Sequence, residues 1–172
     1  MTDAYQLILL RHAQAEHADS LADHLRPLAL DGRRQATAVG ADLRESALVP
    51  DAVLVSSAVR TRQTWDLVRS GLEVPAEVAT LSEALYEAGV RSLLDLVRAV
   101  PGDVRRLLVV GHEPTMSQTA ATLADAQTSG SAALARVRTG VPTATYSVLE
   151  SAQPFGDWIA GAVRLVSVVA PA

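Results

Sequence analysis

Short apolar runs alternate with longer stretches of helical character along this chain. Apolar runs bounded by polar residues, Gly or Pro are typical of strands, and they lie near residues 5–10, 52–56, 76–81, 106–110, 144–149 and 162–169. The stretches between them predict helices near 31–47, 58–70, 89–100 and 114–125. We expect Ser57 to cap the second helix and Pro114 to lie in the first turn of the fourth. This alternation predicts an α/β fold, a three-layer α/β/α domain with a mostly parallel central sheet.

Two stretches lack a clear period and are interpreted as loops. Residues 14–29 are polar and acidic, and residues 126–142 are rich in small side chains. The first of them directly follows the first predicted strand. In sheets of this type, ligands bind at the carboxyl ends of the strands, so we expect the functional site at that edge.

The composition bounds the organisation of the chain. A length of 172 residues with 49% hydrophobic residues suits one core, so residues 1–172 are expected to form one domain. The apolar runs fall far short of the roughly 20 residues that cross a bilayer, and no basic leader precedes the first of them. We therefore expect no membrane span and a cytoplasmic protein.

The charged residues narrow the possible chemistry further. Cysteine and lysine are both absent, which excludes disulfides, thiolate nucleophiles, Schiff-base chemistry and a Walker-type phosphate loop. All 15 cationic side chains are therefore Arg, whose planar fork matches phosphate. A net charge of -4 predicts no nucleic-acid partner, so any anion site must be a local cluster of Arg.

Three unusual local sequences follow predicted strands. They are the stretches 11–13, 57–61 and 111–114, which hold Arg11, His12, Arg60 and His112. The carboxyl ends of parallel strands share one edge of a sheet, so two imidazoles and two guanidiniums should converge there. Helix N-termini that open nearby would add positive dipole ends. Such a pocket suits a phosphoryl group.

The chemistry of phosphoryl transfer explains these residue types. Charge on the equatorial oxygens can be met by Arg, protonated His and backbone N–H groups in place of a metal. A neutral imidazole can attack phosphorus, and flanking guanidiniums would keep His12 neutral. His12 directly follows a strand and an Arg, which favours it as the nucleophile, and His112 is placed to donate to an oxyanion. Spacing alone leaves the reverse assignment open.

The sequence Leu-Ile-Leu-Leu-Arg-His-Ala at 7–13 resembles the signature of the histidine phosphatase (phosphoglycerate mutase-like) superfamily. Within that superfamily, the pattern is most similar to the SixA-type phosphohistidine phosphatases. The stretches that carry the narrower resemblance are 11–16, 26–28, 32–36, 56–64, 85–88 and 110–114. The resemblance implies a phosphoglycerate mutase-like fold with His12 as nucleophile. It also implies Arg11, Arg60 and His112 as phosphate ligands, with no cofactor.

The resemblance further implies a carboxylate that protonates the leaving group and then activates water. The superfamily's Leu-x-Glu pattern is met at Leu85-Tyr86-Glu87 and at Leu81-Ser82-Glu83. We prefer Glu87, because Gly89 follows it as in many relatives, and keep Glu83 as the alternative. The chain departs from the superfamily in having Ala13 in place of Gly. It also lacks the large insertions with which mutase relatives close over small substrates, which implies an open pocket.

These residues support a metal-independent phosphatase that acts on phosphohistidine of a partner protein. A phosphatase for a small phosphomonoester or nucleotide is the first alternative, and a phosphate-sensing module without turnover is the second. A metal hydrolase is disfavoured, because the chain has no His-Glu-x-x-His or Asp-rich cluster and the Arg forks would repel a cation.

Overall fold

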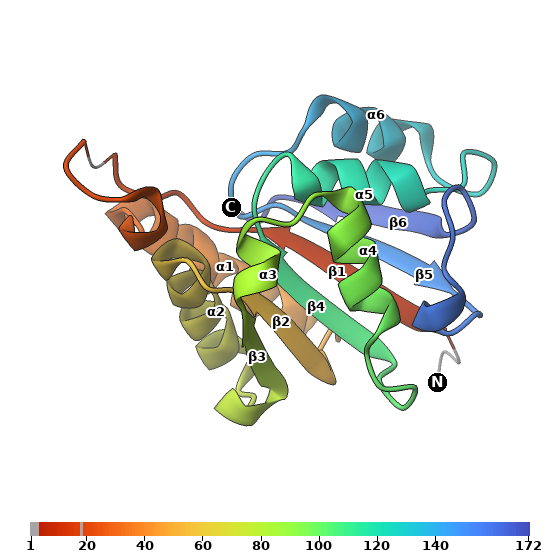
Figure 1. Ribbon diagram of the computed structural model, residues 1–172, viewed down its shortest axis with the longest axis horizontal. Helices are drawn as coiled ribbons and strands as arrows, with labels where there is room; N and C mark the ends of the chain where they lie inside the picture. Colours follow the sequence, from red (N-terminus) through yellow and green to blue (C-terminus); the bar gives the residue numbers. More distant parts are fainter. Residues whose placement is uncertain (1–3, 18) are drawn as a thin grey trace.

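The computed structural model describes residues 4–17 and 19–172. Its centre is a six-stranded sheet in the order β3-β2-β4-β1-β5-β6 (Figure 1). The strands are β1 (Tyr5–Arg11), β2 (Ala52–Ser56), β3 (Ala79–Ser82), β4 (Arg106–Gly111), β5 (Tyr146–Ser151) and β6 (Arg164–Val169). The first four strands pair in parallel, whereas β5 and β6 pair antiparallel. The sheet is therefore mixed and mostly parallel, as predicted.

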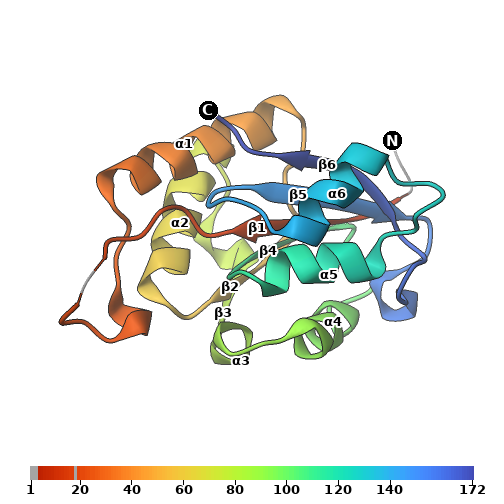
Figure 2. The same ribbon diagram turned by 90° about the horizontal axis from the view of Figure 1, so that it is seen from above.

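Helices cover both faces of the sheet (Figure 2). They are α1 (Leu30–Glu45), α2 (Val59–Leu72), α3 (Glu83–Tyr86), α4 (Val90–Arg98), α5 (Thr115–Leu123) and α6 (Ser131–Thr139). The 3-10 turns are η1 (Asp23–Leu25), η2 (Ala76–Val78) and η3 (Phe155–Asp157). Helices α1 and α2 contribute to one buried cluster, and α3 to α6 contribute to the other. The three-layer α/β/α fold is confirmed.

The position of β1 in the centre of the sheet explains why its sequence is a continuous apolar run. Successive side chains of a strand point to opposite faces of the sheet. Leu7 and Leu9 accordingly pack into the cluster with α4, α5 and α6, while Ile8 and Leu10 pack into the cluster with α1 and α2. A strand buried on both faces cannot alternate apolar with polar residues, and this fixes β1 in the middle of the molecule.

Some local predictions were wrong. Residues 126–142 were interpreted as a loop, but they contain α6, which buries Leu134 and Val137. Its nine residues offer too few apolar positions for a helical period to stand out from the small residues around them. Ser57 does not cap α2: the cap is Ala58, because the Ser57 N–H still bonds the carbonyl of Ser82 beyond the end of β2.

Other boundaries shift by smaller amounts. Pro114 is the N-cap of α5 and lies just before its first turn, not within it. Of the strand expected at 76–81, the first residues form the 3-10 turn η2 and the strand begins at Ala79. The described residues of the loop predicted at 14–29 hold only η1 and a single bridge between Ala15 and Leu28. Across the described residues, no helix has the length and apolar character needed to cross a membrane.

Candidate active site

The register of the two central strands brings the two predicted histidines together. Arg11, at the end of β1, lies opposite Gly111, at the end of β4. His12 and His112 directly follow these neighbouring strands, and the His12 N–H donates to the carbonyl of Gly111 at 3.0 Å. Their ring centroids lie 5.4 Å apart. Parallel pairing therefore places two imidazoles at one point of the carboxyl edge.

Arg60, in the first turn of α2, joins the two imidazoles. Its Nε donates to His12 Nε2 at 3.3 Å, and its Nη2 donates to His112 Nδ1 at 3.2 Å. The side chain is buried. Residues from the ends of β1 and β4 and from the helix that follows β2 thus meet, as the spacing predicted.

The hydroxyl group of Thr64 links the turn after β1 to helix α2. The Ala13 N–H donates to Thr64 Oγ1 at 3.0 Å, and that hydroxyl donates to the carbonyl of Arg60 at 2.7 Å. The turn after β1 is thereby tied to the first turns of α2. Because Ala13 and Thr64 are both buried, loss of this link would leave the Ala13 N–H without a partner away from water.

The hydrogen bonds of His12 define which nitrogen is free. Nδ1 lies 2.7 Å from the carbonyl oxygen of Ala13, which only accepts, so Nδ1 carries the hydrogen. Nε2 then has the lone pair, and it faces Arg60. Burial lowers the pKa of His12 to about 4, with a smaller contribution from Arg60 and Arg11. The flanking guanidiniums were predicted to keep His12 neutral, but burial lowers its pKa more than they do.

His112 has the opposite tautomer. Because Arg60 can only donate, His112 Nδ1 accepts from it, and the hydrogen sits on Nε2, which donates to Ser56 Oγ at 2.7 Å. Burial and the charge of Arg60 lower the pKa of His112 to about 3. Both imidazoles are therefore neutral at pH 7.

Arg11 is half-buried at the end of β1. Its Nη1 donates to the carbonyl of Val141 at 2.7 Å, and burial lowers the pKa of the guanidinium. Its Nε is buried and has no hydrogen-bond partner within the part of the chain that the structure describes. A buried donor without a partner is costly, and an anion bound beside it would satisfy it.

The arrangement provides an imidazole lone pair beside buried Arg donors, which is chemistry for phosphoryl transfer. Comparison with known proteins agrees with this. The model of the histidine phosphatase superfamily (branch 1) matches residues 7–89. A candidate phosphohistidine phosphatase SixA of Nakamurella multipartitia is 36% identical in sequence, covers 98% of this chain and 96% of its own, and superposes with a TM-score of 0.83. The chain belongs to the histidine phosphatase superfamily.

Two further relatives match nearly the whole chain, and the first of them supports the narrower match. A candidate SixA of Agrobacterium tumefaciens is 28% identical, with a TM-score of 0.78, 97% of this chain covered and 98% of that chain. An uncharacterised protein of Mycobacterium tuberculosis is 39% identical over 94% of this chain and 99% of its own length. The resemblance to SixA-type proteins read from the motifs is confirmed, and the chain is a phosphatase of that type.

In this phosphatase, Arg60 also contacts Asp23, a residue that was not predicted from the sequence. The Asp23 carbonyl accepts from Arg60 Nη1 at 2.7 Å, and Asp23 Oδ2 accepts from Nη2 at 3.0 Å. Tyr86 O–H donates to the same Oδ2 at 2.6 Å, and Arg26 Nη1 donates to Oδ1 at 3.0 Å. The sequence held only weak indications of these contacts. Residues 14–29 were expected at the functional edge of the sheet. Arg26 lies in one of the stretches that resemble SixA-type proteins, and Tyr86 lies within the Leu-x-Glu pattern.

The two carboxylates that the sequence favoured lie at α3. Glu83 is the first residue of the helix and Glu87 is its C-cap, and both are exposed. Among the described residues, no hydrogen bond or ion pair joins either one to His12, Arg60 or His112. Tyr86 lies between Glu83 and Glu87 in the sequence, and the centroid of its ring is 5.5 Å from that of His112. The role of Glu83 and Glu87 stays a prediction.

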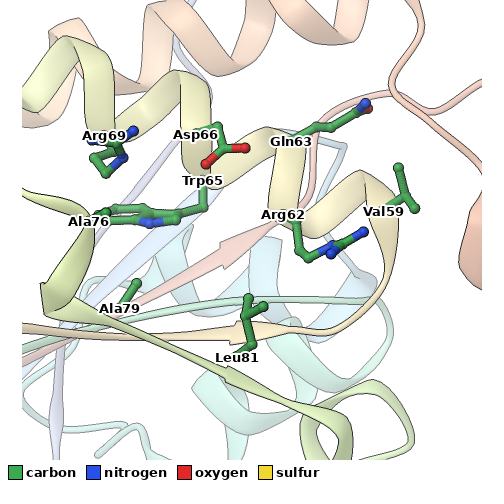
Figure 3. Close-up of a pocket in the computed structure, with 9 residues that line it drawn as sticks. All are labelled: Val59, Arg62, Gln63, Trp65, Asp66, Arg69, Ala76, Ala79 and Leu81. Atoms are coloured by element: carbon green, nitrogen blue, oxygen red, sulfur yellow. The ribbon is translucent and has the colours of Figure 1, made fainter.

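A separate hollow of about 470 Å3 lies between α2 and the edge strand β3 (Figure 3). Its lining residues are Val59, Arg62, Gln63, Trp65, Asp66, Arg69, Ala76, Ala79 and Leu81. None of these residues is among Arg11, His12, Arg60 and His112. Arg62 faces this hollow although Arg60, two residues earlier on the same helix, faces the imidazoles.

Proposed function

We propose that this phosphatase removes the phosphoryl group from phosphohistidine on a partner protein, without a metal, through a covalent phospho-His12. The observation that carries the proposal is the unprotonated Nε2 of His12, which accepts from the buried Arg60 in a ring whose centroid lies 5.4 Å from that of His112. The similarity to the SixA-type protein of Nakamurella multipartitia, which spans nearly the whole of both chains, supports the phosphohistidine substrate.

In the first step, the lone pair of His12 Nε2 forms a bond to phosphorus as the bond from phosphorus to the partner's imidazole breaks. That imidazole leaves with the electron pair and takes a proton from water. In the second step, the oxygen of a water molecule attacks phosphorus and the bond to Nε2 breaks. The proton of the water goes to solvent, and inorganic phosphate is released.

The charge of the transition state would be met by Arg11, Arg60 and His112. Arg11 offers its Nε, which has no hydrogen-bond partner among the described residues, and Arg60 offers the donors that now point at the imidazoles. His112 accepts at Nδ1 in the present state, so Nδ1 must gain a proton before it can donate to a phosphoryl oxygen. A bound phosphoryl dianion favours that protonation, because it places negative charge beside the ring.

Metal independence follows in this proposal from the cations already in place. A divalent ion in phosphoryl transfer neutralises the equatorial oxygens, and two buried or half-buried guanidiniums do the same here. A group of three or more His, Cys, Asp or Glu side chains able to hold a metal ion is not found among residues 4–17 and 19–172.

The experiment compares kcat/KM for a phosphohistidine-bearing protein, p-nitrophenyl phosphate, sugar phosphates and nucleotides, each with and without chelator. We expect turnover in chelator, inhibition by vanadate, and the highest kcat/KM for the phosphohistidine protein. A preference for a sugar phosphate or nucleotide by orders of magnitude would replace the protein substrate with the small-molecule alternative. Binding of phosphate without any turnover would indicate a phosphate-sensing module.

A further inference from the structure

The guanidinium of Arg60 is held along two of its edges. The inner edge, formed by Nε and Nη2, points at His12 Nε2 and His112 Nδ1. The outer edge, formed by Nη1 and Nη2, binds the carbonyl oxygen and the Oδ2 of Asp23. The side chain of Arg60 is 8% exposed and that of Asp23 is 53% exposed, so Asp23 holds a buried cation from the solvent side.

Asp23 is itself fixed by other elements. Tyr86, from α3, donates to Oδ2, and Arg26, after η1, donates to Oδ1. These hydrogen bonds, that of Tyr86 first and then those of Arg60 and Arg26, hold the pKa of the Asp23 carboxyl well below its usual range. The carboxylate is therefore ionised and has a fixed direction at neutral pH.

We propose that Asp23 is a positioning residue for Arg60: by binding the outer edge of the guanidinium, it directs the inner edge at the phosphoryl group that His12 attacks. The proposal rests on the proposed function of His12. Tyr86 and Arg26 serve the same purpose one contact further out, because they fix the carboxylate that fixes Arg60.

The geometry distinguishes this role from a competing one. A carboxylate that had to leave before phosphate could bind would occupy the donors that face the nucleophile. Asp23 leaves Nε and one hydrogen of Nη2 directed at the imidazoles, so a phosphoryl group can accept from the inner edge while Asp23 stays in place. An Arg side chain is long and has many rotamers, and a small misplacement of a transition-state donor is expensive in rate.

The experiment measures kcat and KM for p-nitrophenyl phosphate and the inhibition constant of vanadate in Asp23→Ala, in Arg60→Ala and in the double variant. Asp23→Ala should lower kcat and weaken vanadate binding, by about 10–100-fold in kcat. In the Arg60→Ala background, the same substitution should have little further effect, because Asp23 acts through Arg60.

Matched variants separate positioning from folding and from charge. Asp19→Ala removes an exposed carboxylate from the same segment and should leave both constants unchanged. Tyr86→Phe removes one hydrogen bond to Asp23 and should shift kcat and vanadate binding in the same direction but less. Asp23→Asn keeps an oxygen acceptor and the shape of the side chain, and should fall between wild type and Asp23→Ala. If Asp23→Ala does not fold, these two conservative variants carry the test.

Three results would overturn the proposal. Tighter vanadate binding in Asp23→Ala would make Asp23 a competing ligand. Unchanged vanadate binding with the loss of one limb of the kcat pH profile would make it an acid or base. An undiminished effect in the Arg60→Ala background would mean that Asp23 does not act through Arg60. Vanadate binding needs no turnover, so a wild type that binds vanadate but spares phosphohistidine would contradict only the proposed substrate.

Discussion

The site has an inner part and an outer rim that are built differently. The inner part is Arg11, His12, Arg60 and His112, at the ends of β1 and β4 and at the start of α2. The rim is formed by η1, Arg26, α3 and Glu87. Strand register fixes the inner part, whereas the rim depends on hydrogen bonds between exposed segments. We therefore expect the inner part to set the reaction and the rim to adjust substrate choice and rate.

The electrostatics of the two parts also differ. In the inner part, burial is the largest cause of the lowered pKa values of His12 and His112. In the rim, the hydrogen bond from Tyr86 is the largest cause of the lowered pKa of Asp23, which is half-exposed. Exclusion of water sets the charge state in one part, and directed donors set it in the other. Substitutions in the inner part should thus be the more damaging.

The strongest test of this contrast is His12→Ala, which removes the proposed nucleophile. Turnover should be lost, and so should an acid-labile phosphoryl group that wild type retains after quenching in alkali, because a phosphoramidate forms before water attacks. His17→Ala, at an exposed position before η1 and outside the rim, is the control and should keep both. Label on another residue, or turnover that survives in His12→Ala, would contradict the mechanism.

Arg60→Ala removes a donor that spans the two parts. We expect a loss of about 2–4 kcal/mol in transition-state stabilisation, measured as the ratio of kcat/KM values, by analogy with the loss of one oxyanion donor. Arg62→Ala is a matched control, since it removes the same side chain from the same helix on the side of the hollow. Equal losses in the two variants would show that general positive charge, and not the placement of Arg60, is what matters.

The buried imidazoles should make stability depend on pH. The folded pKa values of about 4 and about 3 lie below the roughly 6.5 of an unfolded chain. The unfolded chain therefore binds more protons as the pH falls below 6.5, and stability that is complete above that pH is lost. At pH 5 the loss should be about 2 kcal/mol for each imidazole.

Urea unfolding of wild type and of the double variant His12→Gln, His112→Gln, at pH 7 and pH 5, measures this difference. The double variant should lose less stability than wild type between the two values. Equal losses would mean that the imidazoles are not held neutral by burial, and the electrostatic contrast between inner part and rim would fail.

The smallest effect is expected in the rim, for phosphohistidine hydrolysis in Glu87→Gln. An alkyl phosphate expels a strongly basic alkoxide and needs an acid, which typically contributes about 10²–10⁴-fold, whereas an imidazole is protonated near neutral pH with little help. Glu87→Gln should therefore slow alkyl phosphates far more than a phosphohistidine protein. Glu83→Gln is the parallel variant and tests the alternative acid. Equal losses on both substrates would favour the small-molecule function.

The sequence by itself determined the fold and the inner part of the site. Apolar runs separated by helical stretches specify a mostly parallel sheet, and parallel strands bring their carboxyl ends to one edge. Residues that directly follow such strands, His12 and His112, have little freedom to be elsewhere. The short helix α6 was missed, because its packing against α5 and β6, and not a pattern in its nine residues, stabilises it.

Only the tertiary structure decided the charge states, the direction of Arg60 and the carboxylate that touches it. Burial is a property of the whole fold, so no local pattern states that it outweighs the guanidiniums at His12. Asp23 meets Arg60 across 37 residues and Tyr86 across 63. These contacts depend on the path of an exposed segment that has no repeating pattern of its own. The pattern of hydrophobic residues predicts where strands end, but the positions of the rim residues depend on contacts between residues far apart in the chain.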